Sequence, residues 1–139
     1  SAPADMPRAR ACRIALLFVV AFHALVRASA AQPPRDRHLT LADGTRLHVR
    51  EAGRGPAVVL LTGWTVPIDI WAPQFATLAA RHRVLALEPR GQGRSTHDTD
   101  ALTPERRADD LAEVLQRLDV RRAVFVGWSL GAVELLRYV

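Results

Sequence analysis

The sequence predicts an α/β fold with a mostly parallel sheet, helices on both faces and an antiparallel hairpin at the N-terminal edge. Three short apolar runs are typical of strands covered on both faces, and they span residues 57–61, 84–87 and 123–126. Segments with apolar residues at helical spacing separate these runs. Such an order implies right-handed crossovers, so we expect the functional site in the loops at the carboxyl ends of the strands.

Length and composition fit one ordinary domain. The chain has 139 residues, of which 49% are hydrophobic, so a sizeable core is possible. Its formal net charge is +5, but the first 30 residues hold four arginines and one aspartate, and the remainder carries only +2. The other arginines are scattered among acidic residues without a basic stripe, so we expect no nucleic-acid partner.

Residues 1–30 have the pattern of a secretory signal peptide. Three arginines precede an apolar run over residues 14–26, and the small residues Ala28-Ser29-Ala30 follow, as signal peptidase requires. Met6 is a possible true start. The run is short for the ~20 residues of a membrane-spanning helix, so we expect cleavage near Ala30. A secreted or periplasmic protein without stable membrane association would result, and an uncleaved membrane anchor is the alternative.

A hairpin and a first helix are expected after a linker over residues 31–37. Apolar and polar residues alternate between Leu39 and Glu51 around Asp43-Gly44, which is a strong hairpin signal. After the first buried strand, a helix is predicted from Pro73 to Ala80, because proline suits the first turn and the apolar residues share one face.

A second helix is predicted to begin at Thr103-Pro104-Glu105. These residues supply a capping hydroxyl, a proline suited to the first helical position and an acid near the positive end of the helix dipole. Apolar residues recur at helical spacing as far as Leu118, so one face should pack on the sheet. The charged residues between them are expected to form a solvated face: Arg106, Arg107, Asp109, Asp110, Glu113 and Arg117.

Ser129 lies between two glycines, where a predicted strand gives way to a predicted helix. The stretch Gly127-Trp128-Ser129-Leu130-Gly131 is a GxSxG element, which demands a tight turn with strained backbone geometry and an outward-facing hydroxyl. Gly127 and Gly131 lack Cβ and let the strand and the helix approach each other. Unpaired N–H groups at a helix N-terminus favour developing negative charge, so the arrangement suits acyl transfer at Ser129.

Taken in this order, the motifs resemble those of the N-terminal half of an α/β-hydrolase, over roughly Leu39 to Val139. The GxSxG element matches the family's nucleophile elbow, and Arg90-Gly91-Gln92-Gly93-Arg94-Ser95 resembles its RGxGxS turn. Thr62-Gly63-Trp64 occupies the place of the oxyanion loop. The resemblance implies an α/β-hydrolase-type domain over residues 38–139, truncated after the elbow, with Ser129 as the nucleophile.

The same resemblance implies an oxyanion hole made by the backbone N–H groups of Trp64 and Leu130, with Gly63 as a loop glycine. Thr62 stands where histidine is common, which leaves the backbone donors untouched. Glu88 replaces the usual aspartate before the RGxGxS turn, where the acid is expected to hold the loop. A serine nucleophile argues against haloalkane dehalogenase and epoxide hydrolase chemistry, because those enzymes place aspartate at this position.

The family's catalytic acid and histidine follow the serine in the chain, and almost no sequence lies there. Glu134 belongs to the elbow helix, so we expect a structural role for it. His82 and His97 precede the serine and are expected on the surface, whereas His38 and His48 are expected to be solvent-facing or hydrogen-bonded strand residues. We therefore expect an incomplete chain that is inactive alone, with the strand beside the elbow as an exposed apolar edge.

The hypothesis that follows is a fragment of an exported, esterase-like serine hydrolase. It would act on an ester-type carbonyl of a small-molecule substrate through an acyl-enzyme on Ser129. No cofactor or metal is expected, because the histidines lack ligand spacing and Gly91 and Gly93 lack the third glycine of a dinucleotide-binding loop. Three alternatives remain: a cofactor-free haloperoxidase-like perhydrolase, a carbon–carbon bond hydrolase with the same serine, and a non-catalytic α/β-hydrolase-like binding protein.

Overall fold

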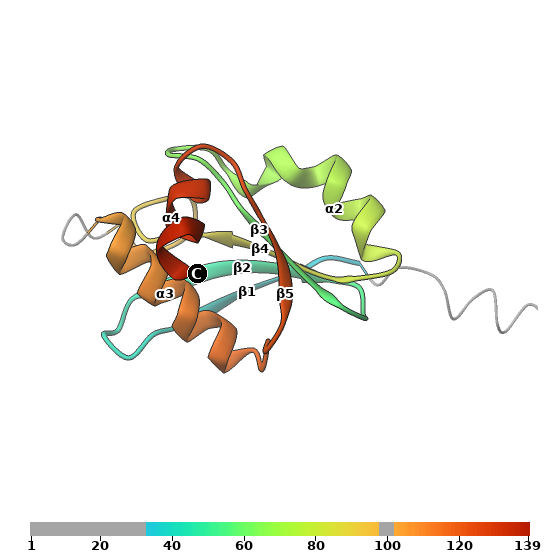
Figure 1. The fold of residues 1–139 in the computed structure, drawn as a ribbon, viewed down its shortest axis with the longest axis horizontal. Coiled ribbons are helices and arrows are strands. Elements are labelled where there is room, and N and C mark those ends of the chain that lie inside the picture. The colour runs from blue at the N-terminus through green and yellow to red at the C-terminus, as the bar shows by residue number, and fades with distance from the viewer. Residues whose placement is uncertain (1–32, 98–101) are drawn as a thin grey trace, which may run out of the picture. The chain divides into compact units, whose positions relative to one another are not determined.

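The computed structural model describes residues 33–97 and 102–139, which form one mixed sheet of five strands with helices against it (Figure 1). The strands in chain order are β1 (Arg35–Thr40), β2 (Arg46–Ala52), β3 (Ala57–Leu61), β4 (Arg83–Glu88) and β5 (Ala123–Gly127). They lie side by side in the order β1-β2-β4-β3-β5. The predicted signal peptide, residues 1–30, lies outside the described residues.

Strands β3, β4 and β5 form the parallel part of the sheet. Leu61 at the carboxyl end of β3 pairs with Leu87 of β4 on one side and with Gly127 of β5 on the other. Strand β2 runs antiparallel to both β1 and β4. The predicted α/β architecture with an antiparallel N-terminal hairpin is therefore confirmed. Strand β5 forms the other edge of the described sheet, where Val124 is 63% exposed.

The β1–β2 hairpin turns at Asp43-Gly44, as the alternation predicts. The Leu41 N–H donates to the Thr45 carbonyl at 2.8 Å, and the glycine of the turn adopts a φ of 87°, which it reaches without a steric penalty. The prediction that a linker extends over residues 31–37 is wrong at its C-terminal end. Strand β1 already begins at Arg35 and pairs with β2 from there, because the regular pairing extends beyond the residues that alternate in polarity.

Helices cover both faces of the sheet (Figure 1). The helical elements in chain order are the 3-10 turn η1 (Ile68–Trp71), α2 (Ala72–Ala79), α3 (Pro104–Arg117) and α4 (Leu130–Tyr138). Elements η1 and α2 pack on one face, and α3 and α4 on the other. The Thr103 hydroxyl accepts a hydrogen bond from the Arg106 N–H at 3.3 Å, which confirms the predicted cap of α3. None of the helices in the described ranges has the length and apolar character needed to cross a membrane.

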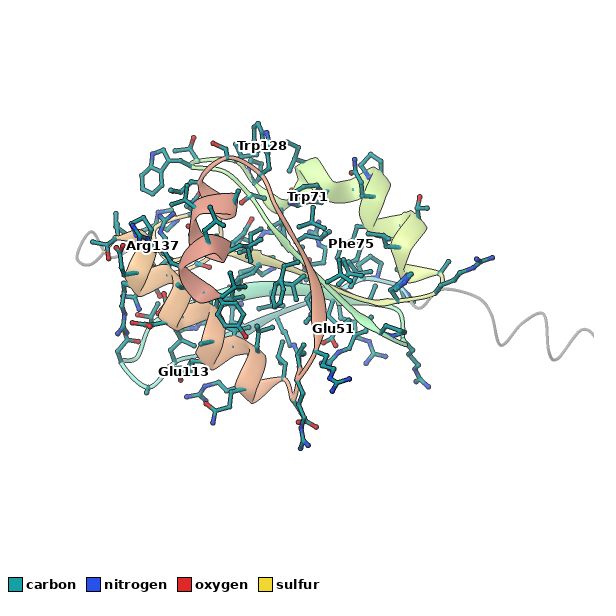
Figure 2. The ribbon with its side chains drawn as sticks, viewed as in Figure 1. Glu51, Trp71, Phe75, Glu113, Trp128 and Arg137 are labelled. Carbon is teal, nitrogen blue, oxygen red and sulfur yellow. The ribbon has the colours of Figure 1, made fainter. Side chains whose placement is uncertain are left out.

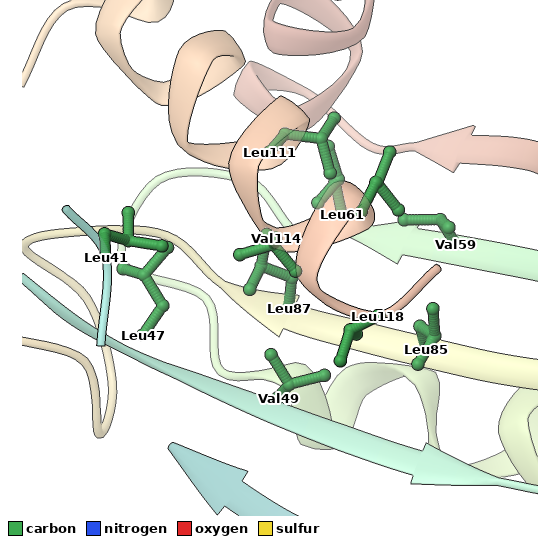
Figure 3. Packing of buried hydrophobic residues seen from close by; sticks show 11 residues of the cluster. Leu41, Leu47, Val49, Val59, Leu61, Leu85, Leu87, Leu111, Val114 and Leu118 are labelled. Carbon is green, nitrogen blue, oxygen red and sulfur yellow. The ribbon is translucent and has the colours of Figure 1, made fainter. Parts of the chain in front are cut away.

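Alternate residues of the parallel strands belong to two separate hydrophobic clusters. Val58 and Leu60 of β3 pack in the cluster beneath α2, whereas Val59 and Leu61 pack in the cluster beneath α3. Figure 3 shows the second cluster, in which Leu111 of α3 packs against the strand residues. Because both faces are covered, β3 is apolar at every position, as the sequence predicts for a buried parallel strand.

The polar side of α3 is only partly solvated, which corrects the prediction of a solvated face. Arg117 is exposed, but Arg107 and Asp110 are buried, with 2% and 3% of their surface exposed. Charged side chains are buried where other parts of the fold supply partners. Here Arg107 pairs with Glu134 of α4, and Asp110 pairs with Arg90 from the loop after β4.

Candidate active site

Ser129 forms the turn between β5 and α4 and is exposed to solvent. Its backbone adopts φ 54° and ψ −121°, a conformation that costs a non-glycine residue about 1–3 kcal/mol. The Trp128 N–H before it donates to the Leu61 carbonyl at 3.1 Å, and the Gly131 N–H after it donates to the Trp128 carbonyl at 3.0 Å. The turn is therefore held from both sides in the strained geometry typical of a nucleophile elbow.

Both glycines of the elbow lie too close to other backbone atoms to carry a side chain. A Cβ on Gly131 would be 2.7 Å from the Thr62 carbonyl oxygen and 2.8 Å from the Leu61 carbonyl oxygen. A Cβ on Gly127 would be 2.7 Å from the Ala132 nitrogen. Since these neighbours are backbone atoms, they cannot move aside by a rotamer change, and the strand and helix meet only because both positions are glycine.

The loop after β3 lies directly against the serine. A Cβ on Gly63 would be 3.0 Å from Ser129 Cβ and 3.3 Å from Trp128 Cε3, so the loop and the elbow are in close contact at this glycine. Trp64 follows, and Thr65 after it has a φ of 61°, so the chain turns sharply at this point. The structure thus brings together the two segments that the sequence analysis assigned to an oxyanion hole.

Two backbone N–H groups beside the serine have no protein acceptor in the described part of the chain. Leu130 is the first residue of α4, where a helical N–H lacks an intrahelical partner. The Trp64 N–H likewise donates to no carbonyl. The side chains of Trp64 and Trp128 are each 47% exposed, and Figure 2 shows Trp128 at the end of the sheet where β5 meets α4. Free donors and apolar surface therefore lie next to an exposed hydroxyl.

A buried guanidinium lies against Trp64, and sequence reasoning missed it. Arg107 Nη1 donates to Glu134 Oε1 at 2.9 Å, Nη2 donates to the Arg90 carbonyl at 3.0 Å, and the centre of the Trp64 ring lies 4.7 Å from Cζ. Burial raises the pKa of Glu134, and the hydrogen bond from Arg107 partly opposes this shift. Arg107 precedes the buried Leu111 by four residues, and this helical spacing was the signal that it lies on the buried stripe.

The Glu88 carboxylate supports the RGxGxS turn, as expected for the acid at this position. Its Oε2 accepts a hydrogen bond from the Arg94 N–H at 2.7 Å, and a Cβ on Gly93 would lie 2.2 Å from the carboxyl carbon. His48 is fully buried, with Nδ1 2.9 Å from Glu88 Oε2 and Nε2 3.2 Å from Asp36 Oδ1. Of the two placements predicted for His48, solvent-facing or hydrogen-bonded, the structure has the second, because polar side chains surround its buried ring.

The other described histidines contact backbone carbonyls. His38, His82 and His97 each have a ring nitrogen within 3.3 Å of a carbonyl oxygen. Within residues 33–97 and 102–139, none of the histidines hydrogen-bonds to Ser129, and no group of three metal-ligating side chains is present. Ser129 therefore has no general base among the described histidines.

A cavity of about 440 Å³ lies away from the serine, between α2 and the β1–β2 side of the sheet. Phe75 and Ala79 contribute to its apolar wall, and Arg50 contributes a charge. Arg50 is already paired with Asp36 and Asp69, with N–O distances of 2.8 and 2.6 Å. The cavity therefore offers a ligand little unpaired charge.

A family model described as alpha/beta hydrolase fold matches residues 56–139. The chain belongs to the α/β-hydrolase family. Among solved α/β-hydrolase structures, Cfl2 wild-type from Burkholderia cenocepacia is similar to this chain, with a TM-score of 0.72 and 31% identity. The likeness covers 76% of this chain and 36% of the Cfl2 chain.

Related α/β-hydrolases carry names with different activities. The chain is 38% identical over 101 residues to non-heme chloroperoxidase CPO-A1 from Kitasatospora aureofaciens, covering 72% of this chain and 37% of that protein. It is 35% identical over 105 residues to bifunctional esterase/perhydrolase DCH from Acinetobacter calcoaceticus, covering 73% and 38%. It is 39% identical over 95 residues to an epoxide hydrolase from Caballeronia sordidicola, covering 66% and 29%. The chain thus spans less than two fifths of the length of each of these relatives.

Proposed function

We propose that this chain carries the nucleophile and the oxyanion hole of a serine hydrolase that acts on ester-type carbonyl groups. The strongest support is the backbone of Ser129, an exposed residue held at positive φ next to two N–H groups that have no acceptor within residues 33–97 and 102–139. Ser129 Oγ would attack the carbonyl carbon, and the N–H groups of Trp64 and Leu130 would stabilise the oxyanion. Collapse of the tetrahedral intermediate would break the ester C–O bond, expel the protonated alcohol and leave the acyl-enzyme, which water would then hydrolyse to the free acid and regenerated serine.

The general base is assigned to a part of the full-length gene product other than the described residues. A serine hydroxyl needs a base to be an effective nucleophile at neutral pH. In α/β-hydrolases the triad follows the order serine, acid, histidine along the chain. The activity proposed here is therefore that of the full-length product. The pattern of residues 1–30 supports its export.

The surface beside the serine favours a substrate with an apolar acyl group. The indoles of Trp64 and Trp128 are both half-exposed next to the elbow and offer apolar, aromatic surface. The name of the esterase/perhydrolase relative includes ester cleavage. Esters of apolar carboxylic acids are the substrates that this combination supports.

Perhydrolysis is a second candidate, favoured by the relatives named chloroperoxidase and perhydrolase. The same acyl-enzyme on Ser129 would react with hydrogen peroxide in place of water and release a peracid. Epoxide hydrolysis is not proposed despite the relative of that name, because serine stands at position 129 where that chemistry uses aspartate.

The test is hydrolysis of p-nitrophenyl acetate and butyrate by the full-length gene product. We expect turnover that falls at least about 10⁴-fold in Ser129→Ala. A matched control is Thr77→Ala, which removes an exposed hydroxyl on α2 that bonds only to the Pro73 carbonyl, and it should keep wild-type activity. Equal activity of Ser129→Ala and wild type, or no hydrolysis by wild type, would contradict the proposal. Peracid formation from acetate and hydrogen peroxide by the same samples tests the second candidate.

A further inference from the structure

One buried guanidinium contacts three separate segments, two of which lie at Ser129. Arg107 on α3 donates to Glu134 of the elbow helix at 2.9 Å and to the Arg90 carbonyl in the loop after β4 at 3.0 Å. Its Cζ lies over the ring of Trp64, 4.7 Å from the ring centre. The elbow helix, the loop after β4 and the loop after β3 are therefore joined through one side chain.

The backbone of the Trp64 loop is held by a long hydrogen bond across the turn, from the Val66 N–H to the Gly63 carbonyl at 3.3 Å. The N–H of Trp64 must stay free to bind an oxyanion, so it cannot anchor the loop. Thr65 holds a left-handed φ of 61°, which is a strained conformation that persists only where the surroundings impose it. The indole is 47% exposed, and the Arg107 guanidinium contacts it from the buried side.

We propose that Arg107 is a positioning residue that holds the Trp64 N–H in place for the oxyanion, an inference that rests on the proposed acyl-enzyme chemistry. The planar guanidinium donates two hydrogen bonds in its plane while its face stays free for the indole, which the ammonium of lysine cannot do. The Nε of Arg107 has no partner among the described residues, and Glu134 is buried with it. A buried ion pair with an unpaired donor is a weak source of stability, because apolar residues can fill such a site without lowering the free energy of unfolding.

The test compares variants of the full-length gene product in the acylation step, measured as the burst of p-nitrophenol. In Arg107→Leu/Glu134→Leu both buried charges are removed together, so no unpaired charge remains. We expect the rate constant for acylation to fall about 10- to 100-fold, with KM changed less than about threefold. The reason is that the Trp64 N–H would be misplaced by a fraction of an ångström. Arg107→Lys should show the same loss in this rate constant. In a Trp64→Ala background the Arg107 substitutions should have little further effect.

The matched control is Arg117→Leu/Glu113→Leu, which removes an ion pair on the same helix, with N–O distance 2.6 Å, and a hydrogen bond from the Ala42 N–H to Glu113 at 2.8 Å. It should leave the burst unchanged. If wild type and control acylate and the folded Arg107 variants acylate equally fast, the inference is overturned while the acyl-enzyme stands. If the double variant does not fold, Arg107→Lys decides by the same criterion. If wild type itself gives no burst, the proposed function fails, and the inference fails with it.

Discussion

Two buried arginines hold two regions of this molecule, and their partners differ in kind. Arg90 donates from Nε and Nη2 to both carboxylate oxygens of Asp110, at 2.6 and 2.8 Å, and reaches Asp43 of the hairpin turn at 2.8 Å. Arg107 meets one carboxylate, one carbonyl and one indole ring. The first arrangement pairs a charge with opposite charges, whereas the second arranges the segments around a candidate nucleophile.

The pKa values of the carboxyl groups in the two regions are shifted in opposite directions. Arg90 lowers the pKa of Asp43 well below its usual range through a side-chain hydrogen bond, and Thr45 contributes further hydrogen bonds. Burial raises the pKa of Glu134 despite the contact with Arg107. The Asp43 carboxyl therefore ionises more readily in the folded hairpin turn than in water, and the Glu134 carboxyl ionises less readily. Local rules of stability are often broken at functional sites, and the elbow region fits that pattern.

Replacing Arg90 should give the largest loss of stability. Arg90→Met leaves Asp110 buried, with only Arg106 nearby at 3.5 Å, so we expect the free energy of unfolding to fall by about 3–5 kcal/mol. Urea denaturation of the full-length product measures this. The exposed Arg117→Met should cost less than about 1 kcal/mol. Equal losses for the two variants would contradict the assignment of Arg90 as a stabilising contact.

Two glycine-to-alanine substitutions distinguish the cost of a steric clash with backbone atoms from the cost of an unfavourable φ. A Cβ at Gly131 meets two carbonyl oxygens at 2.7 and 2.8 Å, so Gly131→Ala should cost about 3 kcal/mol. Gly44 has open space around it and only a φ of 87° to disfavour alanine, so Gly44→Ala should cost about 1 kcal/mol. Thermal and urea unfolding report both values, and the reverse order would show that the elbow tolerates a side chain.

Glu134 should make a contribution to the free energy of unfolding that decreases as the pH rises. Its folded-state pKa is raised above 4.5, so the folded state binds the proton more tightly than the unfolded state does. Its contribution is present below pH 4.5 and is lost as the pH rises through the folded-state pKa, with a slope of at most about 1.4 kcal/mol per pH unit. Glu134→Gln should remove this component in urea titrations between pH 4 and 8. An unchanged profile in the variant would contradict the sign of the shift.

Asp43 should show the smallest effect, with the opposite sign. Because its folded-state pKa is lowered from 3.8, its contribution is present above that pH and is lost as the pH falls. Asp43 is one third exposed, so Asp43→Asn should cost less than about 1 kcal/mol near neutral pH. The difference between variant and wild type should vanish in acid, as measured by denaturation below pH 4. A difference that grows in acid would be incompatible with this assignment.

Local patterns in the sequence predicted the individual strands, the hairpin and the cap of α3, because each depends on neighbours in the chain. The linker over residues 31–37 failed at its end because strand pairing extends past the alternating residues. Burial of Arg107 and Asp110 was mispredicted because their partners, Glu134 and Arg90, come from other elements. Composition alone does not reveal which charge will meet an opposite charge in the fold.

In the candidate site too, local features were predicted from the sequence, whereas a long-range contact was not. The GxSxG spacing predicts a strained serine, and the structure has a serine at φ 54° between a strand and a helix. The contact between Trp64 and Arg107 joins a loop after β3 to a helix after β4, so no local pattern could predict it. Ser129 and the elbow glycines were found from spacing, and the residue that supports Trp64 required the fold.

The most direct test of the central claim is covalent labelling of the full-length gene product with a fluorophosphonate, with the modified peptide mapped by mass spectrometry. We expect a single adduct on Ser129 Oγ, absent in Ser129→Ala and present in the Thr77→Ala control. An unmodified Ser129 in folded protein, or an adduct that persists in Ser129→Ala, would contradict the assignment of Ser129 as a nucleophile.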